Sequence, residues 1–296
     1  MATGIITRRG GSVETFVEAT GGTETEIVDN GQAYRVHTFT SVGTSSLNVT
    51  SGGLVDYLVI AGGGAGSGRY YGGGGGAGGY RCSVSGELSG GGSNAENPLK
   101  VSPQSYTVIV GDGGKNTKRS SGRPGEDSEF GPVVSTGGSG GGTAAVGGSG
   151  GGSSRSSHAR TPGLGIPGQG NDGAEDGSDG GRDGGGGGGG AGTEAPFGGN
   201  VQSNGGDGLT SSITGSAVTR GGGGAGAHKA NDNYYQAIGG TGGGGNGGAD
   251  FSGPTVQPQD GATNTGGGGG AGCWNNTGVG ADGGSGIVIV RYPISG

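Results

Sequence analysis

The sequence is poor in the residues that stabilise ordinary domains. Of its 296 residues, 27 % are hydrophobic, 5 % are aromatic and 13 % are charged. This composition argues against a conventional core of helices and sheets through most of the chain. With only 10 prolines and no strict Gly-X-Y order, collagen is excluded. A membrane span is excluded as well, because no stretch approaches 18 apolar residues.

Cysteine is scarce too. Cys82 and Cys273 are the only two, they lie far apart, and neither has Cys or His neighbours. A zinc site needs clustered ligands, so none is expected. A single disulfide is one interpretation, and two reduced thiols are the favoured one for a protein made in the cytoplasm. The start of the chain, MATGIITRRGG, has no apolar run of signal-peptide length, so we expect synthesis without a signal peptide.

The charge balance disfavours nucleic acid as a partner. The chain has 23 acidic and 16 basic residues, a net charge of -7 and a sequence pI near 4.9. Such a chain has no overall electrostatic attraction to nucleic acid. The charges are also scattered, which is typical of a solvated surface rather than a binding stripe.

Glycine is the abundant residue, with 90 copies, and its runs repeat. The string GGGGAG occurs at 73–78, 187–192, 221–226 and 267–272. Glycine disfavours helices and sheet interiors, whereas polyproline II segments of glycine can approach closely and bond backbone to backbone. We therefore predict a polyproline-II bundle in preference to a flexible linker. Its backbone hydrogen bonds must be nearly complete, because ordering glycine costs much entropy.

Strand-like segments stand at both ends of this glycine-rich body. Those of the first sixty residues are Val13–Val17, Glu26–Val28, Tyr34–Thr40, Ser46–Thr50 and Val55–Ala61, with Asp29-Asn30-Gly31 among the turn signals. Ser105–Val110, a weaker candidate at Phe130–Val134 and the apolar run Gly286–Tyr292 follow. Because so apolar a final strand needs partners on both sides, we predict that the N- and C-terminal strands form one antiparallel β-sandwich flanking the bundle. The fold class is thus all-β with a glycine-rich polyproline-II bundle. We expect 153–183 to form exposed loops.

Motifs for catalysis or cofactor binding fail on inspection. The strand ending in Gly62-Gly63-Gly64 resembles a dinucleotide fingerprint, but more glycine follows where a helix is required. Asp112-Gly113-Gly114-Lys115 lacks the first glycine of a P-loop, and the acidic series Asp172–Asp183 fits no calcium-loop spacing. His37, on an alternating strand, is expected to be structural. We expect no enzyme, no cofactor and no metal site.

Aromatic and polar residues mounted between glycine runs are the positive functional signal. They occur at Arg69-Tyr70-Tyr71, at 231–236 and at Trp274-Asn275-Asn276. Rings beside Asn, Asp and Arg can stack on sugars and bond hydroxyls, and loops on a rigid scaffold commonly carry recognition. The alternative is that these side chains pack on the scaffold or on a sibling subunit. The candidate contact residues are Arg69, Tyr70, Tyr71, Tyr234, Tyr235 and Trp274.

The order of these pieces resembles the glycine-rich domain of bacteriophage structural proteins, abundant in tail fibres and in viruses of marine cyanobacteria. The resemblance rests on Tyr34–Thr40, Val55–Ala61, Gly72–Arg81, Tyr106–Gly114 and Gly284–Tyr292. It frames residues from about 31 to 292.

The resemblance implies a virion component made in the host cytoplasm. Its expected role is a tail-fibre or adhesin part that contacts a host cell-surface glycan or protein. The alternative is a capsid-decorating or fibril-forming protein whose loops contact sibling subunits. Residues 1–30 fall outside the shared pattern and are assigned to docking onto other virion proteins, whereas 31–296 form the glycine-rich domain. A homo-oligomer is expected, without a motif that sets its stoichiometry.

Overall fold

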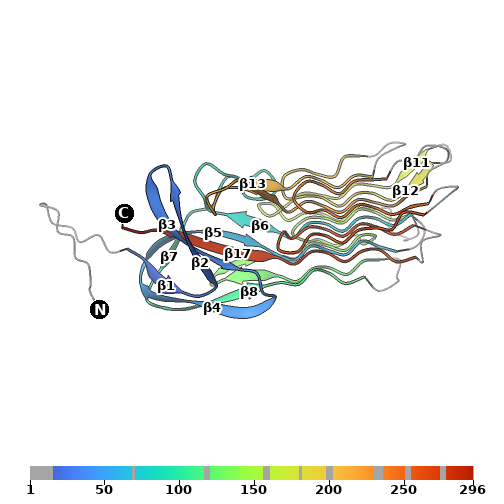
Figure 1. Ribbon diagram of the computed structural model, residues 1–296. Coiled ribbons are helices and arrows are strands. Elements are labelled where there is room, and N and C mark those ends of the chain that lie inside the picture. Colours follow the sequence, from blue (N-terminus) through green and yellow to red (C-terminus); the bar gives the residue numbers. More distant parts are fainter. Residues whose placement is uncertain are drawn as a thin grey trace, which may run out of the picture.

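The protein, described from a computed structural model, is elongated and has two different halves. One half is a β-sandwich that holds the first described residues and the C-terminal strand, and the other is a bundle of long, nearly parallel segments (Figure 1). Within the described ranges, all regular secondary structure is β-strand. These ranges are 16–68, 71–116, 121–155, 161–179, 182–197, 203–229, 236–250, 255–273 and 278–295.

Two sheets make the sandwich. The first has the order β1-β4-β8-β9-β10 and comprises Glu18–Thr20, Gly43–Ser51, Gln104–Val110, Ser128–Phe130 and Val133–Ser135. The second has the order β2-β3-β17-β5-β6 and comprises Thr23–Asp29, Gln32–Phe39, Ile287–Pro293, Gly53–Ile60 and Tyr80–Cys82, with β7 (Leu99–Val101) also pairing β5. All of these pairings are antiparallel.

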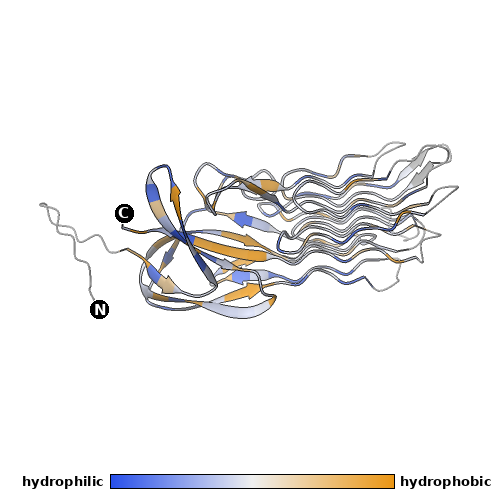
Figure 2. Ribbon diagram, in the orientation of Figure 1, coloured by the Kyte–Doolittle hydropathy of each residue, from blue (hydrophilic) through white to orange (hydrophobic). Residues whose placement is uncertain are grey.

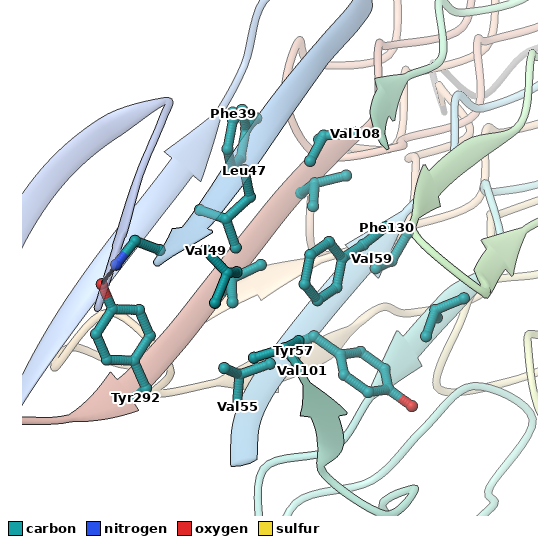
Figure 3. Packing of buried hydrophobic residues seen from close by; sticks show 14 of the residues in the cluster. Phe39, Leu47, Val49, Val55, Tyr57, Val59, Val101, Val108, Phe130 and Tyr292 are labelled. Carbon is teal, nitrogen blue, oxygen red and sulfur yellow. Dashed lines mark hydrogen bonds between the residues drawn. The ribbon is translucent and has the colours of Figure 1, made fainter. Parts of the chain in front are cut away.

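The main hydrophobic core lies between the two sheets. Alternate residues of β5 and β17, among them Val59 and Val288, face Leu47 of β4, Val108 of β8 and Phe130 of β9 (Figure 3). All five side chains are fully buried. Figure 2 shows the hydrophobic residues gathered in the sandwich strands, whereas the bundle is mostly pale. The main hydrophobic core therefore lies in the sandwich, because the glycine-rich bundle has few apolar side chains.

A second apolar layer explains why β5 and β17 have no polar face. Leu58 and Ile289 point away from the main core and pack with Tyr80 and Ile213. This layer is completed by the hairpin of β13 (Leu209–Ser211) and β14 (Val218–Arg220). Strand β17 pairs with β3 on one side and β5 on the other. The prediction that the two ends of the chain meet in one sheet is confirmed.

The strands predicted at 26–28, 34–40, 46–50 and 55–61 correspond to β2, β3, β4 and β5, so these local signals are confirmed. The turn between β2 and β3 has positive φ at Asn30 (50°) and Gly31 (82°), as a two-residue hairpin turn requires. The single strand predicted at 130–134 is instead two strands, β9 and β10, which pair as a hairpin. Gly131, with φ 54°, makes that turn possible.

The segment assigned to docking overlaps the sandwich. Its residues 18–29 contain β1 and β2, which pair with β4 and β3. Of the strand predicted at 13–17, residues 13–15 lie outside the described residues, and the structure has β1 at Glu18–Thr20 instead. The docking role of residues 1–30 stays a prediction.

Hydrogen bonds in the bundle follow the three-residue period of polyproline II. The N–H groups of residues 61–67 donate to three neighbouring segments in turn and return to the same segment at every third residue. The donor–acceptor pairs are Ala61–Gly79, Gly64–Gly76 and Ser67–Gly73, then Gly62–Glu126 and Ala65–Arg123, then Gly63–Gly284 and Gly66–Ala281. The predicted bundle and its nearly complete backbone hydrogen bonding are confirmed for this segment.

The packing around residues 61–67 is hexagonal. Besides donating to three neighbours, this segment accepts N–H bonds from three others, 111–116, 136–142 and 266–273. The repeated GGGGAG strings mark segments that are enclosed in a similar way, since each hydrogen-bonds to five or six neighbours. Ala65 is fully buried, and so are the alanines of the four strings, Ala77, Ala191, Ala225 and Ala271. The repeat therefore identifies the interior of the bundle.

Glycine is required here by the distance between backbones. A Cβ on Gly75 would lie 2.0 Å from the carbonyl oxygen of Gly64, and one on Gly224 would lie 2.1 Å from that of Gly269. No such approach is compatible with a side chain. The close approach lets neighbouring segments hydrogen-bond directly along their whole length.

The expectation of exposed loops over 153–183 is wrong for much of that stretch. Ser153 and Ser154 are fully buried, and Gly163 and Gly173 lie against the carbonyl oxygens of neighbouring backbones. The N–H of Ala174 donates to Gly187, inside a repeat string. Their polar and proline residues made these segments resemble loops in the sequence. An outer polyproline II segment can carry such residues, because it needs glycine only on its inward side. Residues 156–160 and 180–181 lie outside the described residues.

Candidate functional site

Most of the predicted contact residues lie outside the described residues. Arg69, Tyr70, Tyr234, Tyr235 and Trp274 belong to this group. The described residues that flank them are the ends of bundle segments. We call the end of the bundle opposite the sandwich the distal end (Figure 1).

The flanks of the three aromatic motifs meet at the distal end. The N–H of Gly72 donates to the carbonyl of Gly272 at 3.2 Å, and the N–H of Gly272 donates to Ser67 at 2.9 Å. Ala227 donates to the carbonyl of Gly72 at 2.9 Å. Segments that precede or follow the three motifs are therefore direct neighbours. Sequence reasoning found the motifs, but not that their flanks are neighbours.

Tyr71 is the one described residue of the six, and its backbone is unusual. It is half-buried and has φ 55°, a conformation that costs a bulky residue energy. It stands where the chain reverses between two antiparallel segments. Ser67 closes this reversal, since its backbone N–H donates to the carbonyl of Gly73 and its Oγ accepts the N–H of Gly73 at 2.8 Å. The strained position is thus built into the distal end.

A small sheet lies beside these segment ends. It has the order β11-β12-β15-β16 and comprises Gly177–Asp179, Arg182–Gly184, His228–Lys229 and Ala249–Asp250 (Figure 1). Behind it, Ala227, Ala271 and Cys273 form a small buried cluster. Cys82 and Cys273 are both buried and neither forms a disulfide, which agrees with the favoured interpretation of two reduced cysteines.

The outer segments of the bundle are closed by Asp and Asn side chains. Asp207 Oδ1 accepts both the N–H and the hydroxyl of Thr241, at 2.8 and 2.9 Å. Asp172, from the acidic series read as a solvated loop, accepts the N–H of Gly165 at 2.7 Å. These carboxylates replace a missing neighbouring segment. Their signal in the sequence is an Asp or Asn beside a glycine run, which by itself does not separate this role from a turn.

The charged groups near Asp112 serve the same structural purpose. Lys115 Nζ lies 3.2 Å from Asp112 and 3.8 Å from Asp282, so this lysine is occupied by two carboxylates. Asp282 also accepts the N–H of Asn116 at 2.7 Å. The string that imitates a P-loop is thus part of a bundle surface.

The buried polar networks of the sandwich are structural. His37 Nδ1–H donates to the Gly21 carbonyl, so its Nε2 accepts from Tyr292 Oη, which in turn accepts the N–H of Ala19. This network ties the N-terminal segment to β3 and β17, and the structural reading of His37 fits it. Arg291 is buried between Asp29 and Asp56 at 3.2 Å from each.

A third network joins Glu96 to Arg81 and Tyr57. The guanidinium of Arg81 binds both carboxylate oxygens of Glu96, at 2.8 and 2.6 Å, and Tyr57 donates at 2.7 Å. Burial alone raises the pKa of the Glu96 carboxyl, but the hydrogen bonds from Arg81 and Tyr57 outweigh it and lower that pKa. Burial raises the pKa of the Cys82 thiol to about 12, which keeps it protonated. These groups fix strands and loops rather than form an accessible site.

Two searches of the described residues returned nothing. No group of three or more His, Cys, Asp or Glu residues there could hold a metal ion. Likewise, no helix long and apolar enough to cross a membrane occurs among them.

Comparison with protein families gives a match over most of the chain. The family model described as the glycine-rich domain matches residues 40–293, from the end of β3 through β17. No curated protein matches the chain. The matched range covers the sandwich strands from β4 on and the whole bundle between them. The chain therefore belongs to the glycine-rich domain family.

Proposed function

We propose that this protein is a structural component of a bacteriophage virion, in the role of a tail-fibre or adhesin part that contacts the host surface. The observation that carries the proposal is that the described residues flanking three aromatic motifs, Gly72, Ala227 and Gly272, lie on neighbouring segments at the distal end. A hydrogen-bonded bundle without an oily core is a stiff support for such motifs. Recognition commonly sits on loops held by a rigid scaffold.

The placement of the chain ends supports this orientation. The first described residues and β17 lie in the sandwich, at the opposite end from the distal end of the bundle (Figure 1). Attachment to other virion proteins through the sandwich would leave the distal end exposed. The strained backbone of Tyr71 adds support, because such strain clusters at binding sites. The phage assignment itself rests on the resemblance of the motif order.

Binding of purified, labelled protein to candidate bacterial cells tests the proposal. The variants are Tyr70→Ala, Tyr234→Ala and Trp274→Ala. The matched control is Phe16→Ala, which removes a partly exposed ring at the sandwich end. Aromatic residues at the centre of an interface commonly contribute 2 kcal/mol or more, so we expect losses of roughly thirtyfold or more in affinity.

Saturable binding that the three variants lose and the control keeps would support the proposal. Equal losses in the control would place the contact elsewhere. Binding to no tested cell, with cooperative unfolding intact, would favour the alternative of a capsid-decorating or fibril-forming protein.

A further inference from the structure

The outer edge of β2 has no partner strand among the described residues. In the register of β2 with β3, Asp29 pairs Gln32 across the two-residue turn. Backbone bonds then alternate, so the N–H and C=O of Glu24, Glu26 and Val28 point away from β3. The carbonyl of Ala33, opposite Val28, bonds instead to the N–H of Ile294, which confirms this alternation. No hydrogen bond reaches the outward groups of those three residues within the described chain.

Among the described residues, this edge has charged side chains but none of the other usual protections. Strand β2 is seven residues long, contains no proline and pairs with β3 without a register shift. Natural proteins normally shorten, bulge or cover such an edge. The edge also belongs to a hairpin at the sandwich end, away from the bundle (Figure 1). It is therefore an intact template for one more strand.

The side chains along the edge determine which charge is favoured on a strand that pairs with it. Glu24 and Glu26 lie on one face, with side chains 41 % and 60 % exposed, and Val28 beside them is 71 % exposed. Arg35 of β3 donates to Glu26 Oε1 at 2.7 Å, so the charge of Glu26 is already partly offset. Antiparallel pairing with β2 of a second copy would place acidic side chains against acidic ones, in a chain whose net charge is -7. A strand with Lys or Arg at alternate positions would place basic side chains beside Glu24 and Glu26. An apolar residue in the same strand would cover Val28.

We propose that the open edge of β2 is a docking site for an extended basic segment of another protein, which adds to the second sheet as a strand. Backbone hydrogen bonds to Glu24, Glu26 and Val28 provide binding, and the two glutamates select basic side chains. This site lies at the end opposite the aromatic motifs, and it does not depend on the proposed function of the distal end.

A defined peptide tests the site. The probe is a seven-residue peptide with Lys at alternate positions and Thr or Val between them, matched to the length of β2. Its counterpart has Glu in place of each Lys. Calorimetry gives the affinities, and hydrogen exchange reports the amides of Glu24, Glu26 and Val28. We expect binding of the Lys peptide only, with slower exchange at these three amides.

Two variants separate strand addition from general attraction. Val28→Pro removes an outward N–H and leaves the bonds between β2 and β3 in place, so we expect at least about tenfold weaker binding. Glu24→Lys with Glu26→Lys should reverse the preference toward the Glu peptide. The matched control is Glu175→Lys with Glu194→Lys, which makes the same charge change at exposed bundle residues and should leave binding unchanged.

Several results would overturn the proposal. One is binding that survives in Val28→Pro, or that the control weakens as much as the reversal, because the attraction would then be unspecific. Another is the absence of binding. A third is slow exchange of the three amides in the isolated protein. Dilution would then show whether a second copy covers the edge, and removal of residues 1–12 would show whether the chain's own N-terminal segment does.

Discussion

The interior of the bundle should not tolerate a methyl group at Gly75. A Cβ there would lie 2.0 Å from the oxygen and 2.6 Å from the carbon of the Gly64 carbonyl, which are backbone atoms that cannot rotate away. Carbon atoms prefer separations of about 3.5–4.0 Å, so the two segments would have to part by more than about 1 Å. Gly75→Ala therefore tests the packing of the whole bundle.

The cost follows from the bonds that join these segments. Residues 61–67 and 72–79 share the pairs Ala61–Gly79, Gly64–Gly76 and Ser67–Gly73, at 3.0, 2.9 and 2.9 Å. Each contributes about 0.5–1.5 kcal/mol net, and overpacking adds about 1–3 kcal/mol. The reduced entropy of the unfolded alanine chain returns about 0.4–1 kcal/mol. We expect a loss of about 2–7 kcal/mol, against a total stability of about 5–15 kcal/mol.

Urea denaturation followed by circular dichroism measures this loss. The matched control is Gly184→Ala, a buried glycine whose added Cβ would lie 3.1 Å from the Ser203 side-chain oxygen and no closer than 3.4 Å to any other atom. It should change the free energy of unfolding by less than about 1 kcal/mol. If Gly75→Ala is also within about 1 kcal/mol of the wild type, the close packing described here is wrong.

Further predictions concern the polar networks and the thiol. Asp207→Ala should lower the free energy of unfolding by about 0.5–1.5 kcal/mol because it removes the hydrogen bonds to the exposed Thr241, whereas Asp207→Asn, which keeps an acceptor, should lower it by less in the same melts. Glu96→Gln should cost about 1–2 kcal/mol at pH 7. Because the pKa of Glu96 is lower in the folded state, this stabilisation is present above the unfolded value of 4.5 and is lost as the pH falls through the folded value, so the difference from wild type should shrink there. Cys82, with its pKa raised to about 12, should resist iodoacetamide at pH 8 until the protein unfolds, as mass spectrometry would show, and rapid labelling of native protein would contradict its burial.

The sandwich could be predicted where side chains form patterns. A strand is specified by the alternation in Tyr34–Thr40 and by the apolar run of β17, because the core buries their apolar side chains. A turn is specified by Asn30-Gly31, because both residues tolerate positive φ. The hairpin β9–β10 was missed because Gly131 breaks a short apolar run that reads as one strand.

The bundle could be predicted as a type of structure but not as an arrangement. Glycine runs and their repeated strings indicate closely packed polyproline II segments. They do not show that residues 61–67 lie beside 278–286, because glycine has no side chain that selects a partner. For the same reason the sequence locates the aromatic motifs in loops without revealing that Gly72, Ala227 and Gly272 bring their flanks together.

Amide hydrogen exchange in the bundle tests the central claim most directly, which is that the glycine body is an ordered support. Gly64, Gly75, Gly224 and Gly269 donate to Gly76, Gly269, Gly75 and Gly64 respectively. We predict that these four amides exchange as slowly as those of β5 and β17, and only through global unfolding. Exchange of the four glycines at the rate of an unfolded chain, while the sandwich strands stay protected, would contradict the account and make the body a flexible linker.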